Sequence, residues 1–299
     1  MLLKNKRTLL TGGSGFIGRN IVEQLGHKHE LIVPTRLDLD LADAEAVLNF
    51  IKEANVDLVI HSANIGGNRK QLGLQGVTQG NLRIFYNIIR AKKYYSRLVV
   101  LGSGAEYDKS SVITMVKESD FEKSVPKDEY GFSKYAMAKY AENVDYITHL
   151  RIFGVYGKYE DYQTRFISNS ICKALLGLPV TIKQDVYFDY LFINDFVRII
   201  DRIISDNDLL SNKFYNLGTG RPVSLMSLAN IIIRELDNSS FIKIASEGLG
   251  KEYSANTDLL MSELKDFEFT SHETAIKELI EYYKVEVANI DRNSLLNDI

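Results

Sequence analysis

Arg7-Thr-Leu-Leu-Thr-Gly-Gly-Ser-Gly-Phe-Ile-Gly18 is the most informative stretch for the architecture of this chain. Its first five residues read as a short buried strand, and the apolar positions that follow repeat with helical spacing. Glycines spaced G-x-x-G-x-x-G separate the two. Such a turn presents bare backbone N–H groups at the positive end of a helix, which is the arrangement that accepts a pyrophosphate. The alternative is a turn that needs glycine for backbone reasons only, but a strand before and a helix after favour dinucleotide binding. The residues expected to contact the dinucleotide are Gly12, Ser14, Gly15, Phe16, Ile17 and Gly18.

The next predicted strand, 30–36, bears on which nicotinamide cofactor binds. A site that prefers NAD usually carries an acid at this strand end to hold the ribose 2′-hydroxyl, whereas a 2′-phosphate is met by an arginine. Here the strand ends Pro34-Thr35-Arg36 and offers no acid. We therefore expect NADP(H), with Arg36 pairing the phosphate and Thr35 assisting. NAD(H) is the alternative, in which Arg36 is a solvated loop residue.

The remaining first half alternates strands and helices, which predicts an α/β fold with a doubly wound, Rossmann-type parallel sheet. The predicted elements are the strands 37–41, 57–63 and 97–103 and the helices 43–52, capped by Asp43, and 77–95. Ligands of such sheets bind beyond the carboxyl ends of the strands. Further cofactor contacts are therefore expected from Asp40, Leu41, Ser62, Ala63, Asn64 and Asn81.

Tyr130-Gly-Phe-Ser-Lys134 places a phenol and an ammonium four residues apart. On a helix these positions share one face. A nearby ammonium stabilises a phenolate and would lower the tyrosine pKa from its ordinary value, so the pair could serve as an acid and base near neutral pH. The alternative is an aromatic packed under a solvated lysine. Ser103 ends the strand 97–103 at the same predicted sheet edge.

Composition excludes several classes of protein. The net charge of −3 with dispersed cations argues against nucleic acid and polybasic membrane partners. The one cysteine, Cys172, excludes an internal disulfide framework, and the five histidines have no metal-ligand spacing, so no metal is expected. The N-terminus has no signal-peptide core, and no apolar run approaches ~20 residues, so no membrane span is expected. We predict a cytoplasmic protein.

The chain resembles the extended short-chain dehydrogenase/reductase family, also called the NAD-dependent epimerase/dehydratase family, in its nucleotide-sugar branch. The matching segments are T-G-G-S-G-F-I-G at 11–18, L-D-L-D-L at 37–41, H-S-A-N at 61–64, L-G-S-G-A-E-Y at 101–107, E-Y-G-F-S-K at 129–134, R-I-F-G-V-Y-G at 151–157, F-D-Y-L-F-I-N-D at 188–195 and Y-N-L-G-T-G at 215–220. They keep the family order and cover nearly the whole chain. The first half is also similar to the NADPH-dependent GDP-fucose synthases, through segments 30–36 and 63–67 and the missing helix after the second strand.

The resemblance implies roles by position. Ser103, Tyr130 and Lys134 match the catalytic residues, and Phe153 matches a cofactor contact. It also implies that 1–153 is the dinucleotide-binding domain, with segments at about 185–212 crossing back to it, and that 154–299 is mainly a smaller α/β substrate domain. There we expect helices 166–176, 194–204, capped by Asn194, and 224–236. The expected substrate contacts are Gly104, Ala105, Tyr156, Phe166, Asn169, Lys183, Tyr187 and Tyr190. Family members commonly dimerise through two long helices, here about 77–95 and 130–144.

Departures from the family pattern narrow the expected reaction. Dehydratases place Asp-Glu directly after the catalytic hydroxyl residue, where this chain has Gly104-Ala105. Gly154 stands where the family usually has an Asn that helps to hold the substrate. Phe188 stands where the family often has an Arg that binds the diphosphate. No His lies between His149 and His272. The leading expectation is NADPH-dependent reduction of a nucleotide-linked 4-keto-6-deoxy sugar. An NAD-dependent nucleotide-sugar 4-epimerase and a non-catalytic dinucleotide-binding regulator stay open as alternatives.

Overall fold

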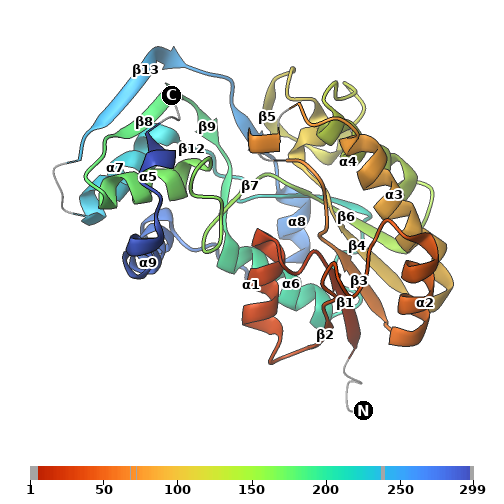
Figure 1. The fold of residues 1–299 in the computed structure, drawn as a ribbon. Coiled ribbons are helices and arrows are strands. Elements are labelled where there is room, and N and C mark those ends of the chain that lie inside the picture. The colour runs from red at the N-terminus through yellow and green to blue at the C-terminus, as the bar shows by residue number, and fades with distance from the viewer. Residues whose placement is uncertain (1–5, 68, 72, 237–239, 297–299) are drawn as a thin grey trace.

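The structure is a computed structural model, which describes residues 6–67, 69–71, 73–236 and 240–296. Its largest feature is a six-stranded parallel sheet in the order β11-β6-β4-β3-β1-β2 (Figure 1). The strands are β1 (Arg7–Thr11), β2 (Glu30–Ile32), β3 (Leu58–His61), β4 (Arg97–Leu101), β6 (Ile147–Ile152) and β11 (Phe214–Leu217). The chain goes outward from β1 to β2 and then returns to the other side of β1 with β3. This reversal between β1 and β3 is where doubly wound sheets bind ligands.

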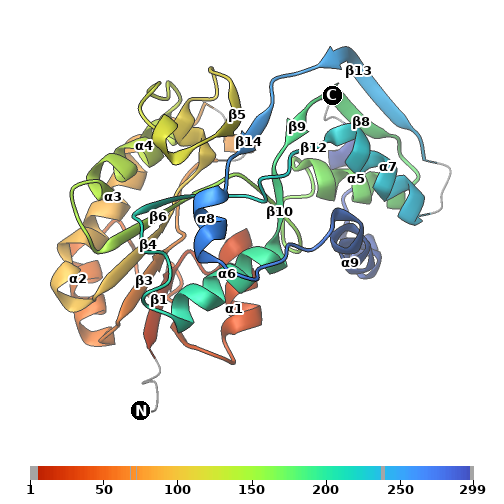
Figure 2. The ribbon, with the colours of Figure 1, turned by 180° about the vertical axis from the view of Figure 1, so that it is seen from behind.

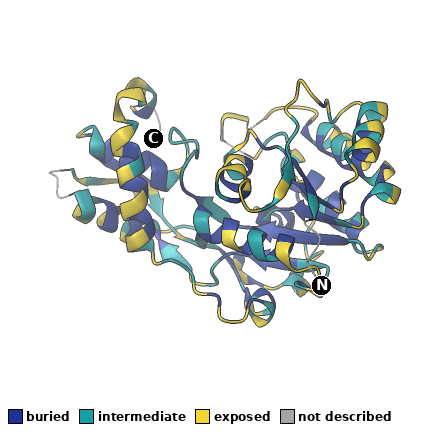
Figure 3. Cartoon of the chain, turned by 90° about the horizontal axis from the view of Figure 1, so that it is seen from below, coloured by how far each residue is buried: buried dark blue, intermediate teal, exposed yellow. Residues whose placement is uncertain are grey.

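Helices cover both faces of the sheet, and the inner strands are buried between them (Figure 3). One face packs on α1 (Phe16–Leu25), α6 (Ile193–Ser205) and α8 (Asp258–Glu263), and the other on α2 (Ala44–Ala54), α3 (Val77–Arg90) and α4 (Glu129–Ala141). The strand β1 shows the alternation, since Leu9 belongs to the second of these apolar clusters and Leu10 to the first. The α/β, doubly wound prediction is confirmed.

A second group of elements lies beside the sheet. It contains α5 (Phe166–Leu175), α7 (Leu225–Leu236) and α9 (His272–Val285) with the parallel pair β8 (Val180–Asp185) and β13 (Ile242–Leu249). Its core is continuous with the core under the sheet, because Ile171 and Ile232 belong to the same buried cluster as Ile200 of α6. The division into a cofactor domain and a substrate domain stays a prediction.

Short strands lie between the two groups. β12 (Val223–Ser224), β9 (Tyr187–Phe188), β14 (Tyr253–Ala255) and β5 (Ile113–Val116) form one sheet in this order, and β7 (Gly154–Tyr156) pairs with β10 (Tyr190–Phe192). Figure 2 shows β14 beside β5, so a segment from the C-terminal part of the chain pairs with a strand of the first half in this four-stranded sheet. Single turns of 3-10 helix occupy 69–71, 92–94, 104–107, 118–120, 287–289 and 293–295.

Two local predictions are wrong. Residues 37–41 form no strand, and β2 already ends at Ile32, because the chain turns at Thr35, whose N–H and hydroxyl both donate to the Asp38 carboxylate. Asn194 does not cap α6 but lies inside its first turn, where its side chain accepts from Gln24 and donates to Glu278.

Two further features concern the outer surface of the chain. No helix in the described part is both long and apolar enough to cross a membrane. The helices of the predicted dimer face, α3 and α4, expose the large side chains Tyr86 and Phe132. The homodimer itself stays a prediction.

Candidate active site

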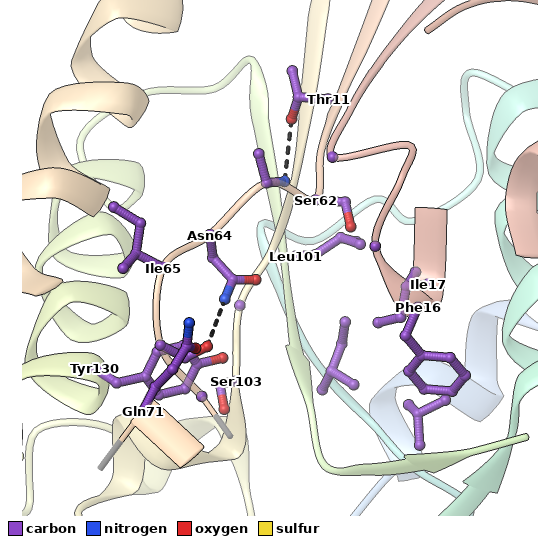
Figure 4. A pocket seen from close by; sticks show the side chains of 18 of the residues that line it. Thr11, Phe16, Ile17, Ser62, Asn64, Ile65, Gln71, Leu101, Ser103 and Tyr130 are labelled. Atoms are coloured by element: carbon purple, nitrogen blue, oxygen red, sulfur yellow. Dashed lines mark hydrogen bonds between the residues drawn. The ribbon is translucent and has the colours of Figure 1, made fainter. Parts of the chain in front are cut away.

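One cavity of about 1000 Å³ runs along the carboxyl ends of the sheet strands. The glycine turn after β1 lines it, and so do Ser103 and Tyr130. In Figure 4 Ser103 and Tyr130 lie side by side, and Phe16 and Ile17 of α1 lie across the cavity from them. The cavity therefore joins the two motifs that are far apart in the sequence.

The glycine turn contains two kinds of glycine. Gly12 has a φ of +74°, and a Cβ there would lie 2.7 Å from the Ala63 nitrogen; a Cβ on Gly18 would collide with the Gly12 carbonyl oxygen. Both are therefore required by the turn and by close packing of α1 on β1. Gly15 differs, because its φ is −77° and its Cβ would meet no described atom closer than 3.4 Å. Its missing side chain leaves the backbone uncovered at the N-terminus of α1, where N–H groups of a helix can bind a phosphate.

The ends of β1 and β3 are tied together beside this turn. Thr11 Oγ1 accepts from the Ala63 N–H at 3.3 Å and lies 2.9 Å from His61 Nδ1 (Figure 4). Burial lowers the pKa of His61 to about 3, so its ring is neutral. These contacts hold Ser62 and Ala63 in the cavity wall.

Asn81 lies outside the cavity lining and braces it from behind. Its side chain accepts from the Ile65 N–H at 2.7 Å, donates to the Ile65 carbonyl at 2.9 Å and donates to Ser133 Oγ at 3.1 Å. It therefore joins α3, α4 and the loop after β3. Gly18 also lies behind the lining. The other predicted cofactor residues that line the cavity are Ser14, Phe16, Ile17, Arg36, Asp40, Leu41, Asn64 and Phe153.

Ser103 follows β4 and caps the 3-10 turn 104–107. Its hydroxyl accepts from the Ala105 N–H at 3.1 Å, while its own N–H donates to Glu106 at 2.8 Å. Glu106 is fully buried, and it also binds His149 Nε2 at 2.8 Å and Arg151 Nε at 2.9 Å. Burial alone would raise the pKa of this carboxyl, but His149 and Arg151 hold it below its ordinary value. An anion thus fixes the backbone of Ser103.

Tyr130 and Lys134 lie in α4, whose N-terminus is capped by Asp128 accepting from the Gly131 N–H at 2.8 Å. Lys134 Nζ is 5.8 Å from the centre of the Tyr130 ring and donates to the Leu101 carbonyl at 2.8 Å. Lys134 is buried outside the cavity lining, and burial lowers its pKa to about 8. It therefore stands behind Tyr130 rather than beside it in the cavity.

The expected fall in the Tyr130 pKa is not seen. Burial raises this pKa, and hydrogen bonding with Ser103 and the nearby Arg165 charge oppose the rise only in part. Desolvation of the phenol outweighs these two effects. Tyr130 therefore keeps its proton at neutral pH, which suits a group that donates a proton.

Several predicted substrate residues do not reach the described cavity lining. Tyr156 is buried, with its hydroxyl 3.0 Å from His272 Nδ1, and Asn169 donates to the Gln163 carbonyl. The others are Gly104 and Ala105, buried behind Ser103, and the exposed Lys183 and Tyr187. A direct substrate contact by these six residues finds no support in the geometry. Phe166 and Tyr190 do line the cavity.

Other residues of the cavity were not predicted. Lys109, Arg165 and Lys251 bring positive charge to the cavity lining, and Arg83 lies in the same lining as Arg36. Arg165 donates to the Gly67 carbonyl at 2.8 Å. Only Lys109, two residues after the L-G-S-G-A-E-Y motif, had a signal in the sequence. Further unpredicted members include Phe188, Glu160, Glu252 and Tyr253. In the described part of the chain no group of His, Cys, Asp and Glu is arranged to hold a metal.

Comparison with known proteins gives one family and a consistent set of relatives. A sequence profile of the NAD dependent epimerase/dehydratase family matches residues 8–218. A GDP-L-fucose synthase of Azorhizobium caulinodans is 24% identical over 254 residues, which are 77% of this chain and 81% of that protein. A GDP-mannoheptose C4 reductase from Campylobacter jejuni with NADP bound superposes with a TM-score of 0.79 at 20% identity, over 95% of this chain and 100% of that one. A UDP-N-acetylglucosamine 4-epimerase from Methanobrevibacter ruminantium gives the same TM-score at 21% identity, over 95% of this chain and 100% of that one.

Proposed function

The chain belongs to the NAD dependent epimerase/dehydratase family, and we propose that within it the protein is an NADPH-dependent reductase of a nucleotide-linked 4-keto-6-deoxy sugar. One observation carries the proposal. Gly15 at the N-terminus of α1 and the hydroxyls of Ser103 and Tyr130 line the same cavity. A dinucleotide laid along the strand ends from Gly15 would bring its nicotinamide end to these hydroxyls.

The chain's own residues favour NADPH over NADH. Arg36 and Arg83 line the cavity beyond the glycine turn, where the adenosine end of the cofactor would lie. The acid nearest β2, Asp38, is outside the lining and is already engaged by Thr35. Two guanidinium groups without a competing carboxylate from Asp38 suit a 2′-phosphate. Bound there, NADPH would supply the hydride.

The hydroxyls of Tyr130 and Ser103, away from the adenosine end of the cavity, would serve the proton transfer. Tyr130 donates its proton to the oxygen of the carbonyl that is reduced, and its raised pKa ensures that the proton is present. Ser103 hydrogen-bonds the same oxygen while its negative charge develops. Lys134, held at the Leu101 carbonyl, stabilises the phenolate that Tyr130 becomes. The backbone of Ser103 is fixed by Glu106, so the two hydroxyls are preorganised.

The cations at the substrate end support a nucleotide-linked substrate. Lys109, Arg165 and Lys251 come from three separate segments and line one end of the cavity. Together they can neutralise a diphosphate, a task that the family arginine does elsewhere and that Phe188 cannot do here. Beside Ser103 the residues Gly104 and Ala105 offer no acid–base pair for eliminating water, which supports reduction over dehydration.

The test is an NADPH oxidation assay with 4-keto-6-deoxy sugars linked to GDP, dTDP and UDP. The wild type should oxidise NADPH with at least one of them, and Tyr130→Phe should bind NADPH normally and turn nothing over. The purified protein is also denatured and any released cofactor is identified. Stoichiometric NAD together with interconversion of 4-hydroxy sugars would establish the epimerase instead. NADPH binding without turnover of any sugar would establish the non-catalytic regulator.

A further inference from the structure

Ser103 lines the cavity together with two phenols. One belongs to Tyr130 of α4, and the other belongs to Tyr253 of β14. Burial raises the pKa of each tyrosine, and hydrogen bonding with the Ser103 side chain opposes the rise in both. The mechanism described above uses Tyr130 and Ser103 but assigns nothing to Tyr253. Its phenol is nevertheless part of the cavity wall.

The fold holds Tyr253 in place from three directions. β14 is paired with β5 on one side and with β9 on the other. The Tyr253 ring packs against Phe153 and Phe188, with ring centres 5.0 and 5.6 Å apart. A Cβ on Gly104 would collide with the Tyr253 hydroxyl oxygen, so the glycine after Ser103 leaves the space that this hydroxyl fills. The place of the Tyr253 side chain is therefore set by residues 104, 153 and 188, which come from separate parts of the chain.

The hydrogen-bonding capacity of Ser103 decides what Tyr253 can do. A serine hydroxyl has one hydrogen to donate and two lone pairs to accept with. One lone pair takes the Ala105 N–H at 3.1 Å. A carbonyl oxygen can only accept, so it needs the single hydrogen of Ser103. This leaves one lone pair of Ser103 for a donor, and burial keeps the Tyr253 phenol protonated and able to donate.

We propose that Tyr253 is a positioning residue whose hydroxyl donates to Ser103 Oγ and thereby directs the Ser103 hydrogen toward the substrate oxygen. The inference rests on the proposed reductase, because it assumes a carbonyl oxygen between Ser103 and Tyr130. It also explains why glycine follows Ser103, since any larger side chain there would displace the donor. The part of the chain beyond residue 250 thus takes part in arranging the catalytic hydroxyls.

A double-mutant cycle tests the proposal by kinetics. Tyr253→Phe should lower kcat roughly tenfold and leave the KM of the keto sugar and the Kd of NADPH unchanged. In a Ser103→Ala background, Tyr253→Phe should cause no further loss, because the hydrogen that it directs is gone. Gly104→Ala should reproduce the Tyr253→Phe defect. Tyr94→Phe, which removes a phenol far from the cavity, should keep wild-type kcat. Equal losses in both backgrounds would show a merely structural role and overturn the proposal.

A second readout does not need turnover. In the NADPH-loaded protein with tyrosine labelled by ¹³C at Cζ, Ser103→Ala should shift the Tyr253 resonance, whereas Ser262→Ala, in α8 and outside the cavity lining, should not. A Tyr253 resonance that does not move in Ser103→Ala overturns the proposal. If the wild type oxidises NADPH with none of the keto sugars, the reductase proposal fails on its own, and the resonance still decides whether Tyr253 donates to Ser103.

Discussion

Arg151 Nε lies 2.9 Å from a carboxylate oxygen of Glu106, and neither side chain is exposed to solvent. The other oxygen of Glu106 lies 2.8 Å from His149 Nε2, and the guanidinium of Arg151 stacks 4.2 Å from the centre of the Phe121 ring. A buried carboxylate is costly unless its partners are in place. Here the partners come from β6, and the carboxylate in turn holds the N–H of Ser103, so β6 fixes the backbone of the proposed catalytic serine.

Glu106→Gln should strongly destabilise the fold. The substitution leaves the Arg151 charge buried without its anion, and breaking such a pair costs about 3–5 kcal/mol. The measurement is the free energy of unfolding from urea titration. The matched control is Glu45→Gln, which breaks the exposed pair with Arg90 and should change that free energy by less than about 1 kcal/mol. Equal losses in the two variants would contradict the assignment of a buried ion cluster.

The Glu106 carboxyl also leads us to expect that the protein loses stability at acidic pH. The folded-state pKa of Glu106 is lowered relative to the unfolded value of ~4.3. Its contribution is therefore fully present above the unfolded pKa and is lost as the pH falls through the lower, folded pKa. Unfolding free energies measured from neutral to acidic pH should fall less steeply in Glu106→Gln than in the wild type. Parallel curves would show that Glu106 is not responsible.

Lys134 should set the alkaline limit of the reductase reaction. Burial lowers its pKa to about 8, whereas the raised pKa of Tyr130 keeps the phenol protonated over the same range. Above pH about 8 the ammonium loses its proton, and the phenolate formed by proton donation is no longer stabilised. We expect kcat/KM to be flat below this pH and to fall above it. In Lys134→Arg the fall should move to higher pH, because a guanidinium stays charged. An unmoved limit would assign the titration to another group.

Arg36 should determine the choice between the two nicotinamide cofactors. Arg36→Ala removes a charged hydrogen-bond donor from the place of the 2′-phosphate and should weaken NADPH binding roughly tenfold or more, with little effect on NADH. Fluorescence titration with both cofactors measures the change. Arg90→Ala removes an equally exposed cation of α3 outside the cavity and is the control. If both variants keep the wild-type preference, Arg36 does not read the phosphate.

The architecture was predictable from the sequence because its signals are local. The strand and glycine turn at 7–18 and the alternation of strands and helices each depend on neighbours in the chain. The loop at Thr35 was missed, since apolar residues at 37, 39 and 41 imitate a strand while the Asp38 carboxylate closes a turn. Local pattern does not show which of two backbone conformations a side-chain hydrogen bond will select.

The site was predictable only where a motif carries it. Ser103 and Tyr130 stand in ordered motifs, and the structure brings them to one cavity. Tyr253 and Lys251 could not be found, because they reach the cavity only through the pairing of β14 with β5 and β9. The pKa of Tyr130 was misjudged for a related reason. Sequence spacing indicates a charge near Tyr130 at Lys134, but only the fold shows the burial that raises the Tyr130 pKa.

The loop after β3 provides a test of how tightly Tyr130 must be placed. Gly67 has a φ of +87°, and a Cβ there would lie 3.0 Å from the Cε2 and Cζ atoms of the Tyr130 ring. Gly73 has a φ of +81°, but its Cβ would meet no described atom within 4 Å. Alanine at either position adds a similar backbone strain of about 1 kcal/mol. Only alanine at Gly67 also pushes the phenol.

Gly67→Ala should therefore lower kcat roughly tenfold or more, because a small displacement of a catalytic group is costly, while Gly73→Ala should keep wild-type kcat. Melting temperatures of the two variants should fall by similar amounts, since the strain is shared. Steady-state kinetics and thermal unfolding of both proteins separate the two effects. If Gly67→Ala keeps full kcat at a lowered melting temperature, the loop yields to the new methyl group, and the position of Tyr130 is set by α4 alone.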